Sequence, residues 1–527
     1  MQIQPVLING QWIPSTGTTS FQAVNPATAE ALDPVFPVSP WDEIESALEA
    51  AADAAKAIRG WSGQRFAAFL EAYANEIEKR TDELVATAHA ETGYPESPRL
   101  RDGELPRTTN QLRQAAAHAR EGTWTQPTID TAAGISSMFG PIGPVAVFGP
   151  NNFPFAFNSI AGGDFAAAVA AGNPVIAKGH SSHPKTTQIF AEAADAAAKA
   201  TDMPAGFVQL IYRTSHADGC RLVSHPLMGA IGYTGGRSAG LTIKEAADKA
   251  GKPAYLELSS INPVFILPGA LTERGADIAE EFKGSCLMGT GQFCTNPGLV
   301  AIKAGETADA FIEAVKQKFE ESPAGILLGE GVQRGFQSGI TAIQSAGATL
   351  VTGGLQTDGP GFSCANTLLK VSGSQFLENP EALQSEAFGN SSLIVVADSD
   401  EQLVQIAECL EGNLTGCIYS HTGGDDEGLY EQLAPALRQK VGRLLNDKMP
   451  TGVAVSPAMN HGGPFPSTGH PVFTSVGIPA AIHRFSMLQC YDNVRPQRLP
   501  EALQPKNPNG KLWRYIDGMY TQADYEA

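Results

Sequence analysis

Between residues 143 and 258 the chain alternates short apolar runs with longer Ala-rich stretches, and Gly or Pro residues separate them. The apolar runs predict strands at 144–149, 175–178, 206–211, 229–233 and 254–258. Helices are predicted between them at about 159–171, 184–200, 216–224 and 238–250. This order favours βαβ units and a parallel sheet covered by helices. Such a layout is typical of nucleotide-binding proteins, but it does not by itself identify a ligand.

The segments on either side extend the α/β pattern, and a chain of 527 residues favours two or three domains. A strand pair at 6–8 and 11–13, turned by Asn9-Gly10, is predicted first, then helices over 42–58 and 64–92. A second α/β region is expected from about 262 to 447, with strands at 264–267, 299–302 and 392–396. Segment 123–142 is interpreted as an excursion for subunit contact, and the Pro-rich residues after about 490 as a surface tail.

Charge and cysteine usage exclude several classes of protein. A net charge of −19 argues against nucleic acid or an anionic membrane surface as a partner. No apolar run approaches the length of a spanning helix, and the first residues do not resemble a signal peptide, so a cytoplasmic enzyme is expected. The seven cysteines are scattered without CxxC or His/Cys metal spacing, so neither a disulfide framework nor a metal site is predicted.

Cys294 is the first candidate for chemistry. It follows a Gly-containing turn, Gly289-Thr290-Gly291, which would let the thiol project from a backbone bend. A thiolate is the strongest common side-chain nucleophile near neutral pH. Taken alone, however, a cysteine at this position is more often a buried thiol without a chemical role.

Two further side chains follow predicted strands. Glu257 ends the strand at 254–258, and its expected burial would raise its pKa and suit it to accept a proton. Asn152 lies just past the carboxyl end of the strand at 144–149, where its amide could donate to an oxyanion. Each alone has an ordinary interpretation, as a strand-edge glutamate and a turn asparagine.

The three residues together, in this order, match a known pattern. The chain resembles the aldehyde dehydrogenase superfamily over most of its length. The segments that carry the resemblance are Gly149-Pro150-Asn151-Asn152-Phe153-Pro154, Val175-Ile176-Ala177-Lys178, Tyr233-Thr234-Gly235-Gly236, Leu256-Glu257-Leu258, Gly291-Gln292-Phe293-Cys294 and Ser385-Glu386-Ala387-Phe388-Gly389.

The resemblance implies a fold with a Rossmann-like cofactor domain, an α/β catalytic domain and a small β oligomerisation extension, assembled as a homodimer or homotetramer. It places the cofactor domain at 1–122 and 143–256, the catalytic domain at 257–485, and the oligomerisation and tail segments at 123–142 and 486–527. Cys294 is then the nucleophile that forms a thioester, Asn152 and the Cys294 backbone N–H are the oxyanion donors, and Glu257 is the general base.

The resemblance also implies a nicotinamide cofactor and the residues that hold it. Those expected at the cofactor are Lys178, Ser181, Arg213, Thr234, Gly235, Gly236, Glu386 and Phe388. Family members that prefer NAD usually have a glutamate shortly after the lysine, whereas here Gly179-His180-Ser181-Ser182 follows it. This favours NADP, with NAD possible, and makes Arg213 a candidate partner for the 2′-phosphate. Gly236 and Asn390 replace the serine and proline of many members.

Within the superfamily the chain is most similar to the branch that oxidises 2-oxoglutarate semialdehyde. Two segments carry this similarity, Gly149-Pro150-Asn151-Asn152-Phe153-Pro154-Phe155-Ala156-Phe157 and His461-Gly462-Gly463-Pro464-Phe465-Pro466-Ser467. The second falls where the family's substrate loop would be. Phe157, Phe293 and Phe465 are expected to wall the substrate tunnel. Aromatic walls would suit a fatty aldehyde, or a broad range of aldehydes, equally well. Arg107 could bind a substrate carboxylate, but a surface arginine at a helix start is the favoured interpretation.

These residues also bear on three alternative functions. A CoA-acylating dehydrogenase typically lacks the glutamate base, so Glu257 argues against it. A thiol hydrolase would pair a cysteine with a histidine, and no histidine stands in a motif with Cys294. A cofactor-binding protein without turnover would not need the intact set of Cys294, Glu257 and Asn152.

Overall fold

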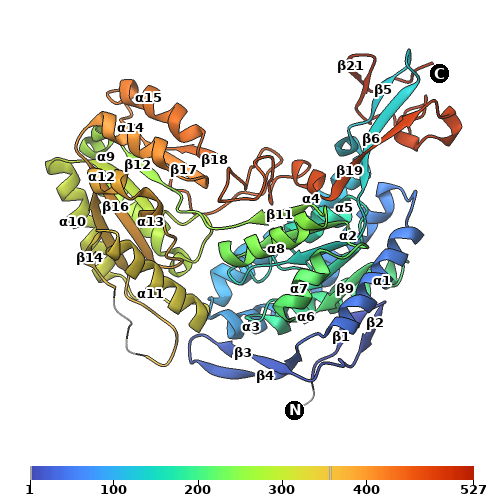
Figure 1. The fold of residues 1–527 in the computed structure, drawn as a ribbon, viewed down its shortest axis with the longest axis horizontal. Helices are drawn as coiled ribbons and strands as arrows, with labels where there is room; N and C mark the ends of the chain where they lie inside the picture. Colours follow the sequence, from blue (N-terminus) through green and yellow to red (C-terminus); the bar gives the residue numbers. More distant parts are fainter. Residues whose placement is uncertain (1–2, 355–356, 358, 527) are drawn as a thin grey trace.

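Two α/β lobes and a projecting β extension make up the molecule, which we describe from a computed structural model (Figure 1). The structure describes residues 3–354, 357 and 359–526. Each lobe is built around its own seven-stranded sheet, and a five-stranded sheet forms the extension. Within the described ranges, no helix is long and apolar enough to cross a membrane.

The sheet of the first lobe has the order β11-β10-β7-β8-β9-β1-β2. Its five central strands are parallel, as the sequence predicts, and the N-terminal strand pair adds antiparallel strands at one edge. Burial on both faces explains why these strands are continuous apolar runs. The strands are β1 (Val6–Ile8), β2 (Gln11–Ile13), β7 (Val145–Phe148), β8 (Val175–Lys178), β9 (Val208–Ile211), β10 (Ala230–Thr234) and β11 (Ala254–Glu257).

Helices cover both faces of this sheet, and two of them differ from the sequence prediction. The single helix expected over 64–92 is broken at Arg80, whose φ of −106° and ψ of 18° leave the helical region. The helix expected from about 159 begins at Gly163, because the preceding residues form turns around Asn158. The helices are α1 (Trp41–Ala57), α2 (Gly63–Lys79), α3 (Thr81–Thr92), η1 (Glu96–Glu104), α4 (Leu105–Glu121), α5 (Gly163–Ala170), α6 (Pro184–Ala200), α7 (His216–Val223) and α8 (Arg237–Lys249).

The second lobe contains the sheet β14-β15-β16-β13-β12-β17-β18, parallel except for its edge strand β14. Its strands are β12 (Val264–Ile266), β13 (Leu299–Lys303), β14 (Thr349–Thr352), β15 (Thr367–Ser372), β16 (Ser391–Ala397), β17 (Asn413–Tyr419) and β18 (Val441–Asn446). Its helices are α9 (Pro268–Leu287), η3 (Met288–Gly291), α10 (Glu306–Glu321), α11 (Glu330–Ser345), α12 (Gly373–Glu378), α13 (Pro380–Leu383), α14 (Asp400–Cys409) and α15 (Glu427–Arg438).

The extension joins two segments that lie far apart in the sequence. Strand β19 (Ser486–Asp492) pairs with β6 (Ile135–Pro141) along its whole length, so the chain end leaves the lobes through this sheet. The other strands are β5 (Thr128–Asp130), β20 (Arg514–Ile516) and β21 (Met519–Thr521), and a separate hairpin pairs β3 (Ser20–Asn25) with β4 (Glu30–Pro37). Short helices η2 (Thr123–Thr125), η4 (Ala480–Phe485), η5 (Pro496–Arg498) and η6 (Glu501–Leu503) connect them.

Candidate active site

Cys294 lies in a tight loop that follows η3. Gly289, Thr290 and Gly291 all have positive φ, between 56° and 66°. At Gly291 a Cβ atom would lie 2.1 Å from the carbonyl oxygen of Gly389, so the close backbone approach excludes any larger residue. The turn expected from the sequence is therefore present, and it brings Cys294 towards the first lobe.

Glu257 is the last residue of β11, and its side chain is buried. Its carboxylate accepts hydrogen bonds from Ser475 Oγ at 2.9 Å and from His461 Nε2 at 2.9 Å. Burial raises the pKa of Glu257, but the charge that His461 can carry and the hydrogen bonds from His461, Ser475 and Cys294 together lower it below its usual value. The sequence-based expectation of a raised pKa was therefore wrong, because it could not include these donors.

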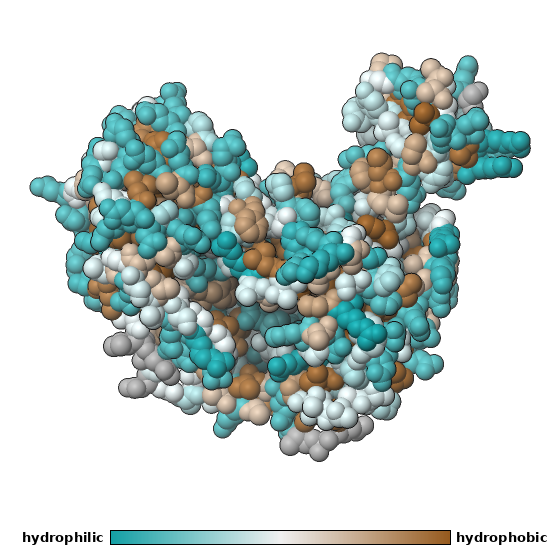
Figure 2. All heavy atoms as spheres, viewed as in Figure 1, coloured by the Kyte–Doolittle hydropathy of each residue, from teal (hydrophilic) through white to brown (hydrophobic). Residues whose placement is uncertain are grey.

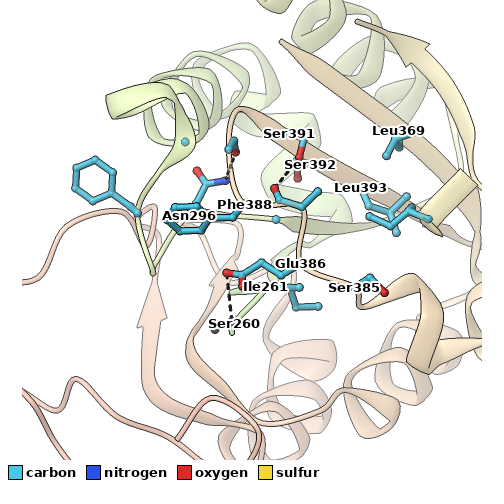
Figure 3. A pocket seen from close by; sticks show the side chains of 16 residues that line it. Ser260, Ile261, Asn296, Leu369, Ser385, Glu386, Phe388, Ser391, Ser392 and Leu393 are labelled. Carbon is cyan, nitrogen blue, oxygen red and sulfur yellow. Dashed lines mark hydrogen bonds between the residues drawn. The ribbon is translucent and has the colours of Figure 1, made fainter. Parts of the chain in front are cut away.

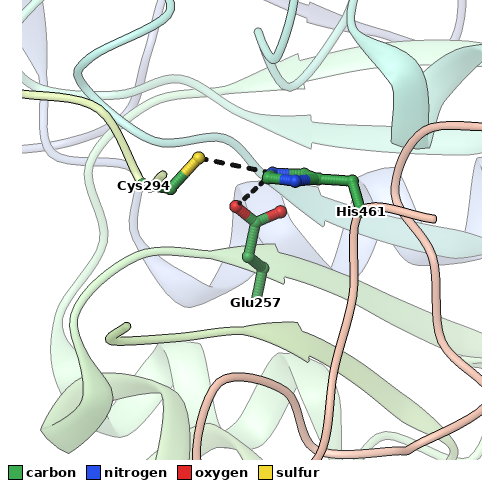
Figure 4. Close-up of side chains that lie close together, drawn as sticks. All are labelled: Glu257, Cys294 and His461. Carbon is green, nitrogen blue, oxygen red and sulfur yellow. Dashed lines mark hydrogen bonds and ion pairs between the residues drawn. The ribbon is translucent and has the colours of Figure 1, made fainter. Parts of the chain in front are cut away.

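His461 is the residue that sequence reasoning missed. Its Nε2 atom lies 3.3 Å from Cys294 Sγ as well as 2.9 Å from Glu257 Oε1 (Figure 4). A hydrogen bond from the Ser475 backbone N–H to the His461 carbonyl holds this part of the chain in place. The sequence pattern predicts a substrate loop from His461 to Ser467, but nothing in it indicates that the imidazole reaches the thiol.

The surroundings of Cys294 keep its thiol protonated. Burial is the largest cause that raises the pKa of Cys294 well above its usual value, and the negative charge of Glu257 adds to it. The charge of Arg107 acts in the opposite direction. One ligand atom each from Glu257, Cys294 and His461 lies within 4.8 Å of the others, a grouping that could hold a metal ion. The sequence predicted no metal, and this remains a prediction.

Asn152 is buried beside the loop that carries Cys294. Its Nδ2 atom donates to the carbonyl oxygen of Gln292, two residues before Cys294, at 3.0 Å. An amide has a second N–H, so the side chain can also donate to an oxygen close to Cys294. The structure thus brings together the three residues that the sequence proposed for catalysis.

Two of the three predicted substrate-pocket residues meet beside Asn152. Phe153 packs edge-on against Phe157 and Phe293, with ring centroids 5.2 and 5.3 Å away. Phe465 is not part of this cluster: its side chain is 56 % exposed, and its ring lies 5.6 Å from the guanidinium of Arg237. The prediction that Phe465 walls the tunnel is corrected, because residues 463–467 turn the ring towards α8.

Arg107 also differs from its predicted position. The sequence favoured a surface arginine, but the Nε and Nη2 atoms are buried and have no hydrogen-bond partner in the described part of the chain. The guanidinium lies 5.4 Å from the ring of Phe157 and 5.8 Å from that of Phe153. Arg107 therefore faces the aromatic cluster rather than solvent.

A pocket formed by residues of the second lobe contains Glu386 and Phe388 (Figure 3). Glu386 Oε1 accepts from the backbone N–H of Ser260 at 3.5 Å, and burial raises the pKa of Glu386 to about 7. A neighbouring cleft of about 480 Å³ is lined in part by Arg237 of α8, Glu386 and Glu411. Arg237 and Glu411 form an ion pair at 3.0 Å across it.

The remaining predicted cofactor residues lie at the carboxyl ends of β8, β9 and β10, on the first lobe. Thr234 ends β10, and Gly235 and Gly236 precede α8, whose first N–H groups have no partner within the helix. A Cβ atom added at Gly236 would meet nothing within 4 Å, so this helix start is open to a phosphate. Lys178 ends β8, and burial and then the charge of Arg213 lower its pKa to about 8. Ser181 follows in the turn before α6. These residues fit a dinucleotide phosphate and ribose.

Comparison with known proteins identifies the family. The model of the aldehyde dehydrogenase family matches residues 12–463. The chain belongs to the aldehyde dehydrogenase family. It is therefore an oxidoreductase that acts on small aldehydes and uses NAD or NADP, as the sequence resemblance implied.

Two curated relatives of this aldehyde dehydrogenase match over nearly their whole length. "Alpha-ketoglutaric semialdehyde dehydrogenase 2" of Azospirillum brasilense is 39% identical over 520 residues, which are 96% of this chain and 98% of the relative. "Alpha-ketoglutaric semialdehyde dehydrogenase" of Acinetobacter baylyi is 35% identical over 527 residues, covering 98% of each chain.

Solved structures confirm the aldehyde dehydrogenase fold. Betaine aldehyde dehydrogenase from Staphylococcus aureus in complex with NAD+ superposes with a TM-score of 0.80 at 19% identity, over 94% of this chain and 96% of that chain. PnpE in complex with nicotinamide adenine dinucleotide superposes with a TM-score of 0.79 at 22% identity, over 93% of this chain and 97% of that chain.

Proposed function

We propose that this aldehyde dehydrogenase oxidises 2-oxoglutarate semialdehyde to 2-oxoglutarate through a thioester on Cys294, with NADP as its preferred cofactor. The observation that carries the chemistry is the convergence of a thiol, a carboxylate and an amide donor at one point, in Cys294, Glu257 and Asn152. The substrate is supported by the two relatives that are 39% and 35% identical and are named for this semialdehyde.

The first step forms a bond between Cys294 Sγ and the aldehyde carbon. Cys294 gives its proton to the nearby Glu257 carboxylate, so the nucleophile is a thiolate although the resting thiol is protonated. The carbonyl electron pair moves onto oxygen, where Asn152 Nδ2 and the Cys294 backbone N–H donate to it. One such donor stabilises the transition state by about 3–4 kcal/mol in comparable oxyanion holes.

The second half of the reaction releases the acid. A bound nicotinamide would supply the hydride acceptor for the tetrahedral carbon, so that a thioester would remain on Cys294. Glu257 releases its first proton to solvent and then accepts one from water, whose oxygen attacks the thioester carbon. The C–S bond breaks, the acid leaves, and Glu257 returns its proton to the sulfur, which restores the thiol. His461 Nε2–H can donate to this sulfur or to Glu257, so it supports the charge at either position.

The preference for NADP rests on the charges around Lys178. Burial chiefly, and then the charge of the exposed Arg213, lower the pKa of Lys178, so two cationic side chains lie near each other at the carboxyl ends of β8 and β9. No acidic residue follows Lys178 in the segment from Gly179 to Ser182. A 2′-phosphate would neutralise this pair, whereas a 2′-hydroxyl would not.

A homo-oligomer assembled through the β extension is part of the proposal. Figure 2 shows apolar side chains among polar ones on this extension. Exposed large apolar side chains beside sheet edges indicate a protein interface. The exposed residues are Met487, Leu488, Trp513, Tyr515, Met519 and Tyr520. Light scattering should show a dimer or tetramer for the native chain and smaller species for Leu488→Asp; a native monomer would contradict the assignment.

Steady-state kinetics test the proposed substrate. We would follow reduced cofactor with NADP and either 2-oxoglutarate semialdehyde or pentanal, an uncharged aldehyde of equal length. A kcat/KM at least tenfold higher for the semialdehyde, which is about 1.4 kcal/mol of discrimination, supports the proposal. Equal or better use of pentanal would instead assign a fatty or broad-range aldehyde dehydrogenase, which the Phe153, Phe157 and Phe293 cluster would also accommodate.

A further inference from the structure

Arg107 is a partly buried cation whose two inner nitrogen atoms are unused. It lies in the first turn of α4, and its Nε and Nη2 atoms lack a hydrogen-bond partner among the residues that the structure describes. These two N–H groups form one edge of the planar guanidinium, the edge that binds a carboxylate side-on through two parallel hydrogen bonds. A buried charge without a partner is costly, so an unused edge of this kind requires an explanation.

The nearest acidic side chain does not provide that partner. Glu104, one turn earlier, accepts hydrogen bonds from the backbone N–H groups of Phe155 and Ala156 at 2.8 and 3.0 Å. Its other carboxylate oxygen lies 3.3 Å from Nη2 of Arg99. Glu104 Oε2 makes this ion pair but no hydrogen bond, and no ion pair within 4.0 Å joins Glu104 to Arg107 in the described ranges.

The two other arginines near the site are already bound to protein groups. Arg99 Nη2 donates to the Asn152 carbonyl at 3.1 Å, and its guanidinium lies 4.4 Å from the ring of Phe153. Arg443 donates to the carbonyl oxygens of Pro450 and Gly452. Arg99 and Arg443 each leave only a buried Nε without a partner among the described residues, whereas Arg107 leaves both Nε and Nη2, one whole edge of its guanidinium.

The position of Arg107 relative to the chemistry suits a substrate group. Its guanidinium lies over the rings of Phe157 and Phe153, which continue through Phe293 to the Cys294 loop. Its charge is also close enough to act on Cys294, since it lowers the pKa of that thiol against the dominant effect of burial. An anion bound at Arg107 would therefore lie at the end of the aromatic cluster that extends to the loop of Cys294.

We propose that Arg107 binds the terminal carboxylate of the substrate, so that the pocket selects short linear aldehydes that carry a carboxylate at the far end. Nε–H and Nη2–H donate to the two carboxylate oxygens, and the aromatic cluster packs against the methylene groups between carboxylate and aldehyde. This inference rests on the proposed aldehyde oxidation and assigns its specificity to one residue. Arg107 acts on substrate binding and takes no part in bond making.

The test compares two aldehydes across matched variants. Arg107→Met keeps much of the volume and removes the charge, Arg107→Lys keeps the charge and removes the side-on edge, and Arg101→Met is the control. Arg101 lies in the same segment, but it is on the surface and pairs with Asp82. For each protein, kcat/KM is measured with 2-oxoglutarate semialdehyde and with pentanal, and circular dichroism checks folding.

For Arg107→Met we expect kcat/KM for the semialdehyde to fall by about 10- to 100-fold, the range for loss of hydrogen bonds to a charged group. The value for pentanal should fall much less, because pentanal makes no ionic contact and loses only the effect of the Arg107 charge on the Cys294 thiol. Arg107→Lys should lose less than Arg107→Met with the semialdehyde, and Arg101→Met should match the native protein. Equal losses for both aldehydes, or no loss for either, would overturn the inference.

Binding of the product gives a second measurement that does not need turnover. Calorimetry with 2-oxoglutarate should show a Kd at least about tenfold higher for Arg107→Met than for the native enzyme. If that variant does not fold, the Kd for 2-oxoglutarate is compared between Arg107→Lys and the native enzyme. A native enzyme that prefers pentanal would refute the proposed substrate, whereas a native preference for the semialdehyde that survives in Arg107→Met would refute only the role of Arg107.

Discussion

The Nε2 atom of His461 lies 3.3 Å from the Sγ atom of Cys294, although 167 positions separate the two residues. The same nitrogen is 2.9 Å from Glu257, so one imidazole touches both the nucleophile and the base. A single Nε2–H can donate to only one of them at a time. It can therefore support the carboxylate while the thiol is protonated and the sulfur while it is charged.

Replacing His461 should move the acid limb of the kcat profile to higher pH. His461 lowers the pKa of Glu257, so Glu257 stays ionised to a lower pH in the native enzyme. In His461→Gln the pKa of Glu257 rises, the carboxylate is protonated at a higher pH, and its work as a base is lost earlier as the pH falls. The profile is measured from pH 4 to 9, with His470→Gln as a control; an acid limb at the same pH in both variants would show that His461 does not act on Glu257.

Replacing Glu257 should make Cys294 more reactive towards an alkylating agent. The negative charge of Glu257 raises the pKa of the thiol, so the neutral amide of Glu257→Gln should lower that pKa and increase the thiolate fraction at pH 8. Iodoacetamide alkylation without cofactor should then be faster in Glu257→Gln, and nearly unchanged in Glu386→Gln, whose charge raises the pKa of the thiol less than that of Glu257 does. Slower alkylation would mean that the carboxylate's removal of the thiol proton limits the reaction.

Removing the amide of Asn152 should impair catalysis without impairing binding. Asn152→Ala deletes a donor to the developing oxyanion, so kcat should fall by about 10²–10³-fold. The affinity for NADP, measured by fluorescence quenching, should be unchanged because Asn152 is not among the cofactor residues. A kcat within threefold of the native value would remove Asn152 from the oxyanion site.

The affinity for NADP should weaken as the pH rises through about 8. Burial and Arg213 lower the pKa of Lys178 to about 8, so above that pH the lysine loses the charge that would bind a 2′-phosphate. NAD carries no such phosphate, and its Kd should change less over pH 7 to 9. Lys178→Met should flatten the pH dependence for NADP. Parallel curves for both cofactors in the native enzyme would contradict the placement of the phosphate.

The sequence predicted the sheet of the first lobe because buried parallel strands are short apolar runs between helices. It also placed Cys294, Glu257 and Asn152 at strand ends or turns, since turn residues mark those points locally. The errors involve contacts between distant segments. His461 reaches Cys294 only because residues 461–475 cross the end of β11, where Ser467 accepts from the backbone of Leu258. Local pattern at Arg107 likewise could not show that the first turn of α4 faces Phe157.

The central claim is that oxidation proceeds through an acyl group on Cys294 that Glu257-activated water removes. Glu257→Gln should slow this removal. At pH 8 the loss of the Glu257 charge also favours the Cys294 thiolate without a proton acceptor, so mixing the variant with NADP and 2-oxoglutarate semialdehyde should give one equivalent of reduced cofactor per site in a burst. Turnover after the burst should be at least about 10²-fold slower than in the native enzyme. Mass spectrometry of the quenched protein should find the acyl adduct on the peptide that contains Cys294. A burst with the adduct on another residue, or turnover at the native rate with no adduct, would contradict the mechanism.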